Sequence, residues 1–370
     1  MIRSYSPLFA CLALSVACAS SSKGSDNPDA GQYDDYYDEN GGSSTDGGAS
    51  PATTKDPVGP RPKARMSTST RAGASKTGKS IALAPSKPPV TGGDKPHTPP
   101  PNLKSEFAVE GFFPTTAAVG SLIEVYGSGF PDDPKQAKVF VGGKPLKVVE
   151  LTPDRIVAEV GGVSSGVIEV GKGTGRINRR NRAKTPTTFT ATAADGAFGQ
   201  ARTQVGHGLL GAVYEVGDGA TEIPNFNELG APIALVAVDD LDIPAGEAPA
   251  GIAGRGQNFG IHFQGSLNIV EAGDYELCLA AGDGALLFLD DTPIIDNDGS
   301  GATREVCETL SVEPGEYGLQ LLYYQGADSE AGLTLSWSKD GGAKAPIPAQ
   351  SFFPPEDLYG IAVANAQQGG

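Results

Sequence analysis

Hydrophobic and polar residues alternate with a period of two along much of the C-terminal half of the chain. In residues 259–264 the apolar side chains Phe, Ile and Phe are separated by Gly, His and Gln, and residues 275–280 repeat the pattern. Such alternation is typical of a β-strand with one buried face. Glycine and aspartate, which favour turns, lie between these runs at 273–274 and 282–284. The stretch from residue 258 to 299 therefore predicts a row of short antiparallel strands.

The same alternation is present earlier, between residues 107 and 192. It runs through LIEVYGSGF, KVFVGG, RIVAEV and GVIEV, which are separated by turn residues. Short strands at this spacing predict a small β-sandwich of about seven strands. We therefore expect an all-β protein with two β-domains.

The N-terminus has the pattern of an export signal. An apolar run at residues 8–17 follows Arg3 and ends in small residues before Cys18. This arrangement resembles a bacterial lipoprotein signal, which implies that Cys18 is lipidated as the first residue of the mature chain; the alternative is an ordinary cleaved signal peptide. Both readings predict an exported chain. The first predicts a lipid-anchored protein at the outer membrane or the cell surface, held to the membrane by its lipid.

Residues 19–105 show no sustained period and are dominated by Ser, Gly, Pro, Thr, Asp and Lys. A segment of this composition buries too little apolar surface to fold, so we expect a disordered tether. The predicted order along the chain is a signal peptide (1–17), a disordered tether (18–105), a first β-domain (106–192), a second β-domain (206–354) and a flexible tail (355–370).

Two cysteines, Cys278 and Cys307, then remain for the mature β-domains, since Cys11 lies in the predicted signal and Cys18 is its predicted lipidation site. Both lie on the same kind of strand face by alternation, in a compartment that permits disulfides. We expect a cross-strand disulfide; the alternative is two unpaired thiols.

Blocks in the two domains resemble known families. In the second domain FGIHFQG, AGDYELCLAAGDGALLFLDD, IIDNDG, VEPGEYGLQLLYYQG and LTLSW resemble, in this order, the protective-antigen (PA14) domain and its fibro-slime relatives. In the first domain FFP, YGSGF, VGG and DRI resemble the immunoglobulin-like IPT/TIG domain. The resemblance implies an Ig-like β-sandwich followed by an antiparallel PA14 barrel or sandwich. The PA14 family includes glycan-binding adhesin modules, accessory domains of glycosidases and purely structural domains.

Calcium is the one cofactor for which the sequence argues. Calcium binds several oxygens at loop corners, and acidic residues gather at the predicted strand ends. The lectin branch of the PA14 family holds calcium with two adjacent Asp; Asp283 matches the second, while Gly282 replaces the first. The candidate ligands for calcium and glycan are therefore Asp283, Asp296, Asn297 and Asp298. The alternative is that these residues only cap turns.

A basic loop stands out in an acidic chain, whose net charge is −16. This balance argues against nucleic acid as a partner. The loop at GKGTGRINRRNRAK contains Arg176, Arg179, Arg180 and Arg182, which form a candidate contact surface for an anionic polymer or an envelope protein. The alternative is that these charges protect a strand edge from aggregation.

The sequence gives little support to catalysis. It contains three His, none beside a Ser or Cys nucleophile signature. We therefore predict a non-catalytic surface protein whose PA14-type domain binds glycans of a matrix or of another cell. The alternative is a structural or protein-docking lipoprotein of the envelope that binds no glycan.

Overall fold

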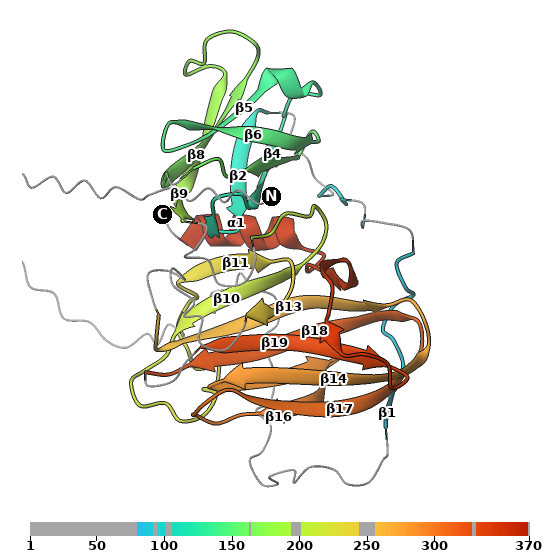
Figure 1. Cartoon of the computed structure of the whole chain (residues 1–370). Helices are drawn as coiled ribbons and strands as arrows, with labels where there is room; N and C mark the ends of the chain where they lie inside the picture. Colours follow the sequence, from blue (N-terminus) through green and yellow to red (C-terminus); the bar gives the residue numbers. More distant parts are fainter. Residues whose placement is uncertain are drawn as a thin grey trace, which may run out of the picture. The chain divides into compact units, whose positions relative to one another are not determined.

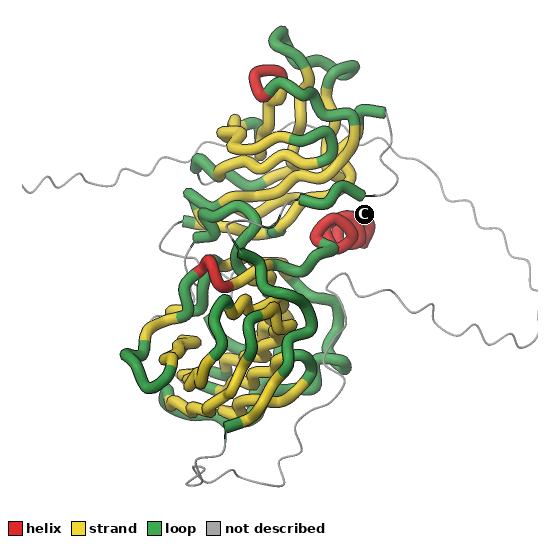
Figure 2. The backbone as a smooth tube through the Cα atoms, turned by 90° about the vertical axis from the view of Figure 1, so that its right-hand side faces the viewer, coloured by secondary structure: helices red, strands yellow, loops and turns green. Residues whose placement is uncertain are grey.

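The structure is a computed structural model that describes residues 80–91, 95, 97–100, 106–162, 164–193, 201–243, 256–327 and 331–368. Strands make up most of the described backbone (Figure 1, Figure 2). The expected all-β fold is therefore confirmed. The signal peptide, Cys18 and the tether before residue 80 lie outside the described residues.

The first domain is one eight-stranded sheet folded around its own apolar core. The sheet order is β2-β4-β7-β6-β5-β8-β9-β3. Its core is built by residues that alternate inward, among them Phe112, Ile123, Val139 and Phe189, each at most 1% exposed. The elements are β2 (Ala108–Phe113), β3 (Thr116–Ala118), β4 (Leu122–Ser128), η1 (Pro134–Gln136), β5 (Ala137–Val141), β6 (Lys144–Leu151), β7 (Arg155–Glu159), β8 (Gly166–Lys172) and β9 (Arg182–Thr192).

The second domain pairs two sheets across a shared apolar core. One sheet has the order β11-β10-β13-β18-β15-β16 with β21 beside β13, and the other β1-β17-β14-β19-β12 with β20 beside β19. Phe263 and Leu321 of the first sheet share a core with Leu277 and Leu335 of the second. The elements are β10 (Leu209–Glu215), β11 (Ala234–Val238), β12 (Asp242–Ile243), β13 (Phe259–Ile269), β14 (Gly273–Gly282), β15 (Gly284–Leu289), β16 (Thr292–Asn297), β17 (Arg304–Val312), β18 (Gly315–Gln325), β19 (Gly332–Lys339), β20 (Ala345–Pro346), η3 (Ala349–Ser351) and β21 (Phe352–Phe353).

The predicted disulfide joins neighbouring strands of the second sheet. Cys278 of β14 lies directly opposite Cys307 of β17 in the antiparallel register. Their Cα atoms are 4.1 Å apart and their sulfurs are bonded. The expectation of a cross-strand disulfide is confirmed.

Part of the expected tether is ordered against the second domain. Strand β1 (Ile81–Leu83) pairs in parallel with the edge strand β17, and the main chain of Lys87 bonds to that of Glu316. Farther along, the side-chain amide of Asn268 accepts a hydrogen bond from Val90 N (3.0 Å) and donates one to Val90 O (2.9 Å). The prediction that disorder extends to residue 105 is therefore wrong for this segment. Its apolar run is too short to signal a strand, and β17 supplies the hydrogen-bonding edge that orders it.

The expected flexible tail is also wrong, because residues 358–368 form helix α1 (Leu358–Gln368). Its side chains Leu358, Ile361 and Ala362 are at most 8% exposed and recur at helical spacing on one face. This face packs on β2 at Gly111, where a Cβ atom would lie 2.5 Å from the carbonyl oxygen of Ala362.

Residues of both domains and of α1 belong to one apolar cluster. Phe113 and Tyr126 of the first domain belong to the same cluster as Leu210 of the second domain and Ile361 of α1. Backbone bonds join the domains as well, since Leu235 O accepts from Thr115 N at 2.9 Å. The first domain is therefore packed against the second, and the chain segment between them is not their sole connection.

Candidate functional site

Asp283 links three loops at one end of the second domain. It stands between β14 and β15, after a cis peptide bond from Gly282, and is only 3% exposed. Its Oδ1 accepts a hydrogen bond from Gly301 N (2.7 Å) and its Oδ2 accepts one from Gly326 N (2.8 Å). The carboxylate therefore holds the β14–β15 turn to the loops that follow β16 and β18.

The neighbouring acidic loop is held by its own polar side chains. Asp298 Oδ1 accepts from Ile223 N (2.7 Å) and from Gly299 N (2.7 Å). Asn297, 1% exposed, donates from Nδ2 to Leu279 O (3.0 Å) and to Arg304 O (2.9 Å). Asp296 is exposed, and its Oδ1 accepts from Asp298 N (3.1 Å). The structure thus brings Asp283, Asn297 and Asp298 together, while Asp296 lies on the outside.

Arg304, which the sequence reasoning missed, lies at the centre of this loop cluster. Its guanidinium donates five hydrogen bonds to four main-chain oxygens. The acceptors are the carbonyls of Asp283 (3.3 Å), Asn297 (2.8 Å), Gly299 (3.2 Å from each Nη) and Asp298. An arginine a few residues after Asp298 was the one signal that the sequence offered for it. We call Asp283, Asn297, Asp298 and Arg304 the buried cluster.

The sequence matches two family models, the IPT/TIG domain over residues 108–191 and the PA14 domain over residues 236–351. The chain carries an IPT/TIG domain followed by a PA14 domain. The buried cluster lies within the PA14 domain. No match to a curated protein was found.

Several solved structures are similar to the chain at low identity. One is an anti-sigma factor domain-containing protein (22% identity, TM-score 0.33, 40% of this chain and 48% of that chain), so the chain spans about half of that protein. The PA14 domain of the antifreeze protein MpAFP is 20% identical, with a TM-score of 0.35 over 40% of this chain and 89% of that chain. A PA14 sugar-binding domain from an RTX adhesin is 16% identical, with a TM-score of 0.34 over 40% of this chain and 99% of that chain. At these identities the likeness concerns the fold alone. None of the helices in the described ranges has the length and hydropathy of a membrane span.

The buried cluster does not fit a calcium ion as it is arranged. Calcium takes about six to eight oxygen ligands. Here four carbonyl oxygens of the loops accept hydrogen bonds from Arg304, each oxygen of Asp283 accepts one from a backbone N–H, and Gly282 offers no carboxylate. Asn297 Oδ1 is buried and has no hydrogen-bond partner among the described residues, but it would supply only one ligand atom. The guanidinium supplies the positive charge that these oxygens require.

The cysteine group of the PA14 domain does not fit a metal ion either. Cys278, Glu305 and Cys307 come within 4.8 Å of one another, but the two sulfurs are bonded to each other and provide no thiolate.

An exposed polar rim lies on the loops next to the buried cluster. It consists of Asp218, Thr221, Asp296 and Ser300, all of which are exposed. Ser300 N donates to Thr221 O (3.0 Å), which ties two of the rim loops together. Below the rim, burial raises the pKa of the Tyr324 phenol, and the nearby charges of Asp283 and Asp298 raise it further, so this group stays protonated. The rim therefore presents hydroxyls and carboxylates on a fixed base.

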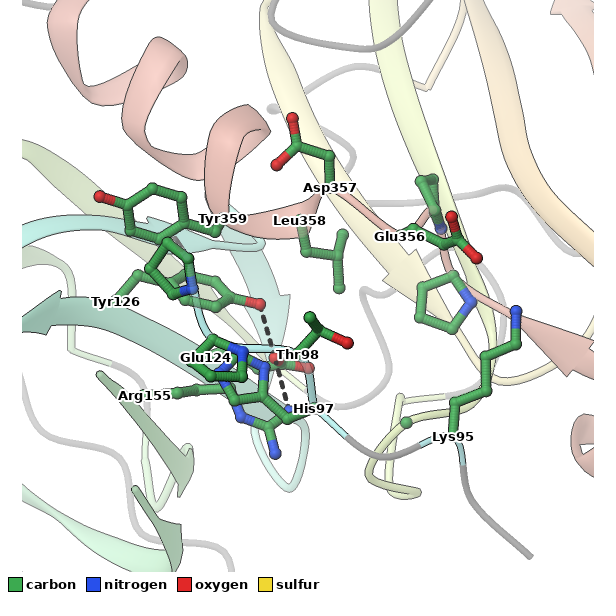
Figure 3. Close-up of a pocket in the computed structure, with 15 residues that line it drawn as sticks. Lys95, His97, Thr98, Glu124, Tyr126, Arg155, Glu356, Asp357, Leu358 and Tyr359 are labelled. Carbon is green, nitrogen blue, oxygen red and sulfur yellow. Dashed lines mark hydrogen bonds and ion pairs between the residues drawn. The ribbon is translucent and has the colours of Figure 1, made fainter. Parts of the chain in front are cut away.

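A second polar constellation lies at the junction of the two domains (Figure 3). A cavity of 570 Å³ is lined by Tyr126 of the TIG domain, by Tyr359 of α1 and by residues 97–100 of the N-terminal segment. Beneath it Glu124, 1% exposed, accepts hydrogen bonds from Tyr126 Oη (2.7 Å), Arg155 (3.2 Å) and Arg202. Because the buried charges of Glu124, Arg155 and Arg202 are paired with one another, we interpret this constellation as a structural connection between the domains.

The pKa of Glu124 reflects this pairing. Burial alone would raise it, but the charges of Arg202 and Arg155 and the hydrogen bond from Tyr126 outweigh burial and lower the pKa to about 2. The carboxylate is therefore ionised at neutral pH. Sequence reasoning missed it, since Arg202 is 78 residues away along the chain.

The basic loop of the TIG domain joins β8 to β9. Arg176, Arg179 and Arg180 are exposed. Arg182 lies instead on β9, where it forms an ion pair with Glu169 (3.1 Å) that Lys184 shares (2.5 Å). The four predicted arginines therefore divide into three in the loop and one that is paired on a strand.

Proposed function

We propose that this protein is a non-catalytic adhesion protein whose PA14 domain binds carbohydrate. The observation that carries the proposal is the PA14 domain together with the polar rim, which its buried cluster holds in place. Sugar rings offer hydroxyls that both donate and accept hydrogen bonds, and the rim offers the matching carboxylates and hydroxyls at Asp218, Thr221, Asp296 and Ser300.

The buried cluster supports binding by keeping the rim loops in one arrangement. Asp283 and Asp298 connect loops that are distant in sequence through backbone N–H groups of Gly301, Gly326 and Ile223. Pre-ordered loops lose less conformational freedom when a ligand binds, and this raises affinity. We therefore assign Asp283, Asn297 and Asp298 to positioning, and the direct contacts to the rim. In this proposal the binding is independent of calcium.

The proposed location is the cell envelope, with Cys18 as the lipid attachment site. The support is the sequence of the first 18 residues, with its apolar run and small residues before the cysteine. Labelled palmitate fed to the native cells should appear in the protein and be absent from a Cys18→Ala variant. An unlabelled wild-type chain would refute the anchor.

Glycan binding is tested on a glycan array with the mature chain in buffer containing EDTA. Asp296→Ala and Ser300→Ala should reduce binding at least tenfold. Both should change the free energy of unfolding by no more than about 0.5 kcal/mol, since both side chains are exposed, even though Asp296→Ala removes the turn hydrogen bond from Asp298 N. Asp132→Ala is the matched control, because Asp132 is an exposed carboxylate of the TIG domain.

Two outcomes of the array would contradict the proposal. The first is that no glycan binds the folded wild-type chain. The second is that both rim variants bind as well as the Asp132→Ala control, which would place the contacts elsewhere on the domain.

A further inference from the structure

Three cationic side chains stand together on the TIG domain, and no acidic side chain in the part of the chain that the structure describes pairs with them. They belong to residues 173–181, the loop between β8 and β9 at one end of the first sheet (Figure 1), which we call the arginine loop. Arg176, Arg179 and Arg180 are exposed, and none forms an ion pair with a carboxylate of the described residues. Their charge is therefore available to a partner.

The arginine loop is held in one shape by its own asparagines. Asn181 Oδ1 accepts from Asn178 N (2.6 Å), and Asn178 Oδ1 accepts from Arg180 N (2.9 Å). The loop is also fixed to the sheet, since Gly173 N donates to Gln136 O (2.7 Å). The guanidinium groups thus project from an ordered backbone, and binding does not have to order it.

Neighbouring lysines add to the positive charge. Lys138 donates to the carbonyls of Thr174 (3.2 Å) and Gly175 (2.8 Å), and Lys172 donates to Gly129 O (2.9 Å). These acceptors are neutral, so both lysines keep their charge. Acidic side chains along the sheet and the adjoining turn include Glu169, which pairs with Arg182 and Lys184, Asp133, which caps η1, and the exposed Asp132. This end of the domain is net positive in a chain of net charge −16.

We propose that the arginine loop binds a polysaccharide that carries sulfate or phosphate groups. Guanidinium groups bind such oxyanions through paired hydrogen bonds. The acidic remainder of the protein would repel a broad anionic surface such as a membrane. A single polymer strand needs only the loop, and at physiological salt charges more than about 8 Å away are largely screened. This site goes beyond the proposed function, because it recognises charge and lies in the other domain.

The length of β9 separates the two sites. The arginine loop precedes Arg182 at one end of β9, whereas the other end, at Thr190–Thr192, pairs with β3 next to the domain junction. At about 3.3 Å per residue the strand spans roughly 30 Å, which is several screening lengths.

The experiment measures binding of the mature chain to immobilised heparin, used as a sulfated probe, over a series of NaCl concentrations. The test variant is Arg176→Gln/Arg179→Gln/Arg180→Gln. Two controls each remove three charges elsewhere. One is Lys144→Gln/Lys147→Gln/Lys344→Gln on exposed strands and turns, and the other is Arg61→Gln/Lys63→Gln/Arg65→Gln in the basic N-terminal stretch.

The arginine-loop variant should lose at least tenfold in affinity. The negative slope of log affinity against log salt should become shallower by about two, as expected for three lost contacts to a single-stranded polyanion. Both control variants should bind like wild type. Affinity retained in the loop variant, or lost equally in the N-terminal control, would overturn the proposal. So would binding to phosphatidylglycerol vesicles with no binding to heparin, because the partner would then be a lipid surface.

Discussion

Arg304 should make the PA14 loops stable without calcium, and this can be tested by replacing it with methionine. Methionine keeps much of the aliphatic length but donates no hydrogen bond. The substitution leaves the carbonyls of Asp283, Asn297, Asp298 and Gly299 without their shared donor. These oxygens lie in a partly buried loop cluster, so water replaces the guanidinium only in part.

The expected cost follows from the number of acceptors. A hydrogen bond to a charged group contributes about 1.5 to 3 kcal/mol, and several weaker bonds that share one donor do not add fully. Because Arg304 is partly exposed, we expect the free energy of unfolding to fall by about 2 to 4 kcal/mol. For a protein of this size the melting temperature should drop by roughly 5 to 10 °C.

The assay is thermal unfolding of the mature chain in EDTA and in millimolar CaCl2. Wild type should melt at the same temperature in both buffers, because the guanidinium occupies the carbonyls that a cation would need. Arg304→Lys should recover part of the stability lost in Arg304→Met, since an ammonium keeps the charge but not the planar set of donors. Arg182→Met, on an exposed β9 position with one ion pair, is the matched control and should change stability by less than about 0.5 kcal/mol.

Two results would refute this reasoning. A wild-type melting temperature that rises by several degrees with calcium would mean that calcium binds the native state, by linkage, and that Arg304 moves aside for it. Equal stability of Arg304→Met and Arg182→Met would mean that the carbonyls do not depend on the guanidinium.

Three further predictions concern the joints of the fold. The pKa of Glu124 is lowered from 4.5 to about 2, so the carboxylate stabilises the native state above pH 4.5 and loses this contribution as pH falls towards 2. The stabilisation is about 3 kcal/mol. The free energy of unfolding of Glu124→Gln should therefore depend less on pH over this range than that of wild type, and an equal dependence would contradict the assignment. Gly111→Ala places a Cβ atom 2.5 Å from a main-chain oxygen of α1, so the free energy of unfolding in urea should fall by about 1 to 3 kcal/mol. Gly161→Ala, whose Cβ would have nothing within 4 Å, should lower it far less. Equal effects of the two variants would contradict the packing of α1. Removing the Cys278–Cys307 disulfide, which closes a separation of 29 residues, should lower stability by about 3 to 4 kcal/mol, and an unchanged denaturation midpoint in dithiothreitol would count against it.

Local patterns were sufficient to predict the strands and the disulfide. Alternation at residues 275–280 places Cys278 on a defined face, and β17 carries Cys307 in register with it. Alternation along each strand shows which face each cysteine occupies, and the sequence displays it directly.

The parts that failed depend on partners far away in the chain. Helix α1 is short and follows two prolines. Its apolar face is buried only because Gly111 of β2 leaves room for the helix backbone. Strand β1 needs the free edge of β17, and the pKa of Glu124 needs Arg202 from another segment. None of these partners is visible within a window of ten or fifteen residues.

At the candidate site the sequence predicted the location of the residues but not their role. The sequence located the correct loops, yet it assigned to Asp283 and Asn297 the task of contacting a ligand, and both are at most 3% exposed. In a loop rich in glycine, unpaired backbone N–H groups are costly to bury, and a carboxylate that accepts two of them stabilises the turn more than it would in water. Such residues therefore hold the loops together and do not contact a ligand. In the proposed function, sugar selectivity lies with side chains that the buried cluster leaves outside, above all Thr221, Asp296 and Ser300. Exchanging these three among polar residues should change which sugars bind while leaving the fold of the PA14 domain intact.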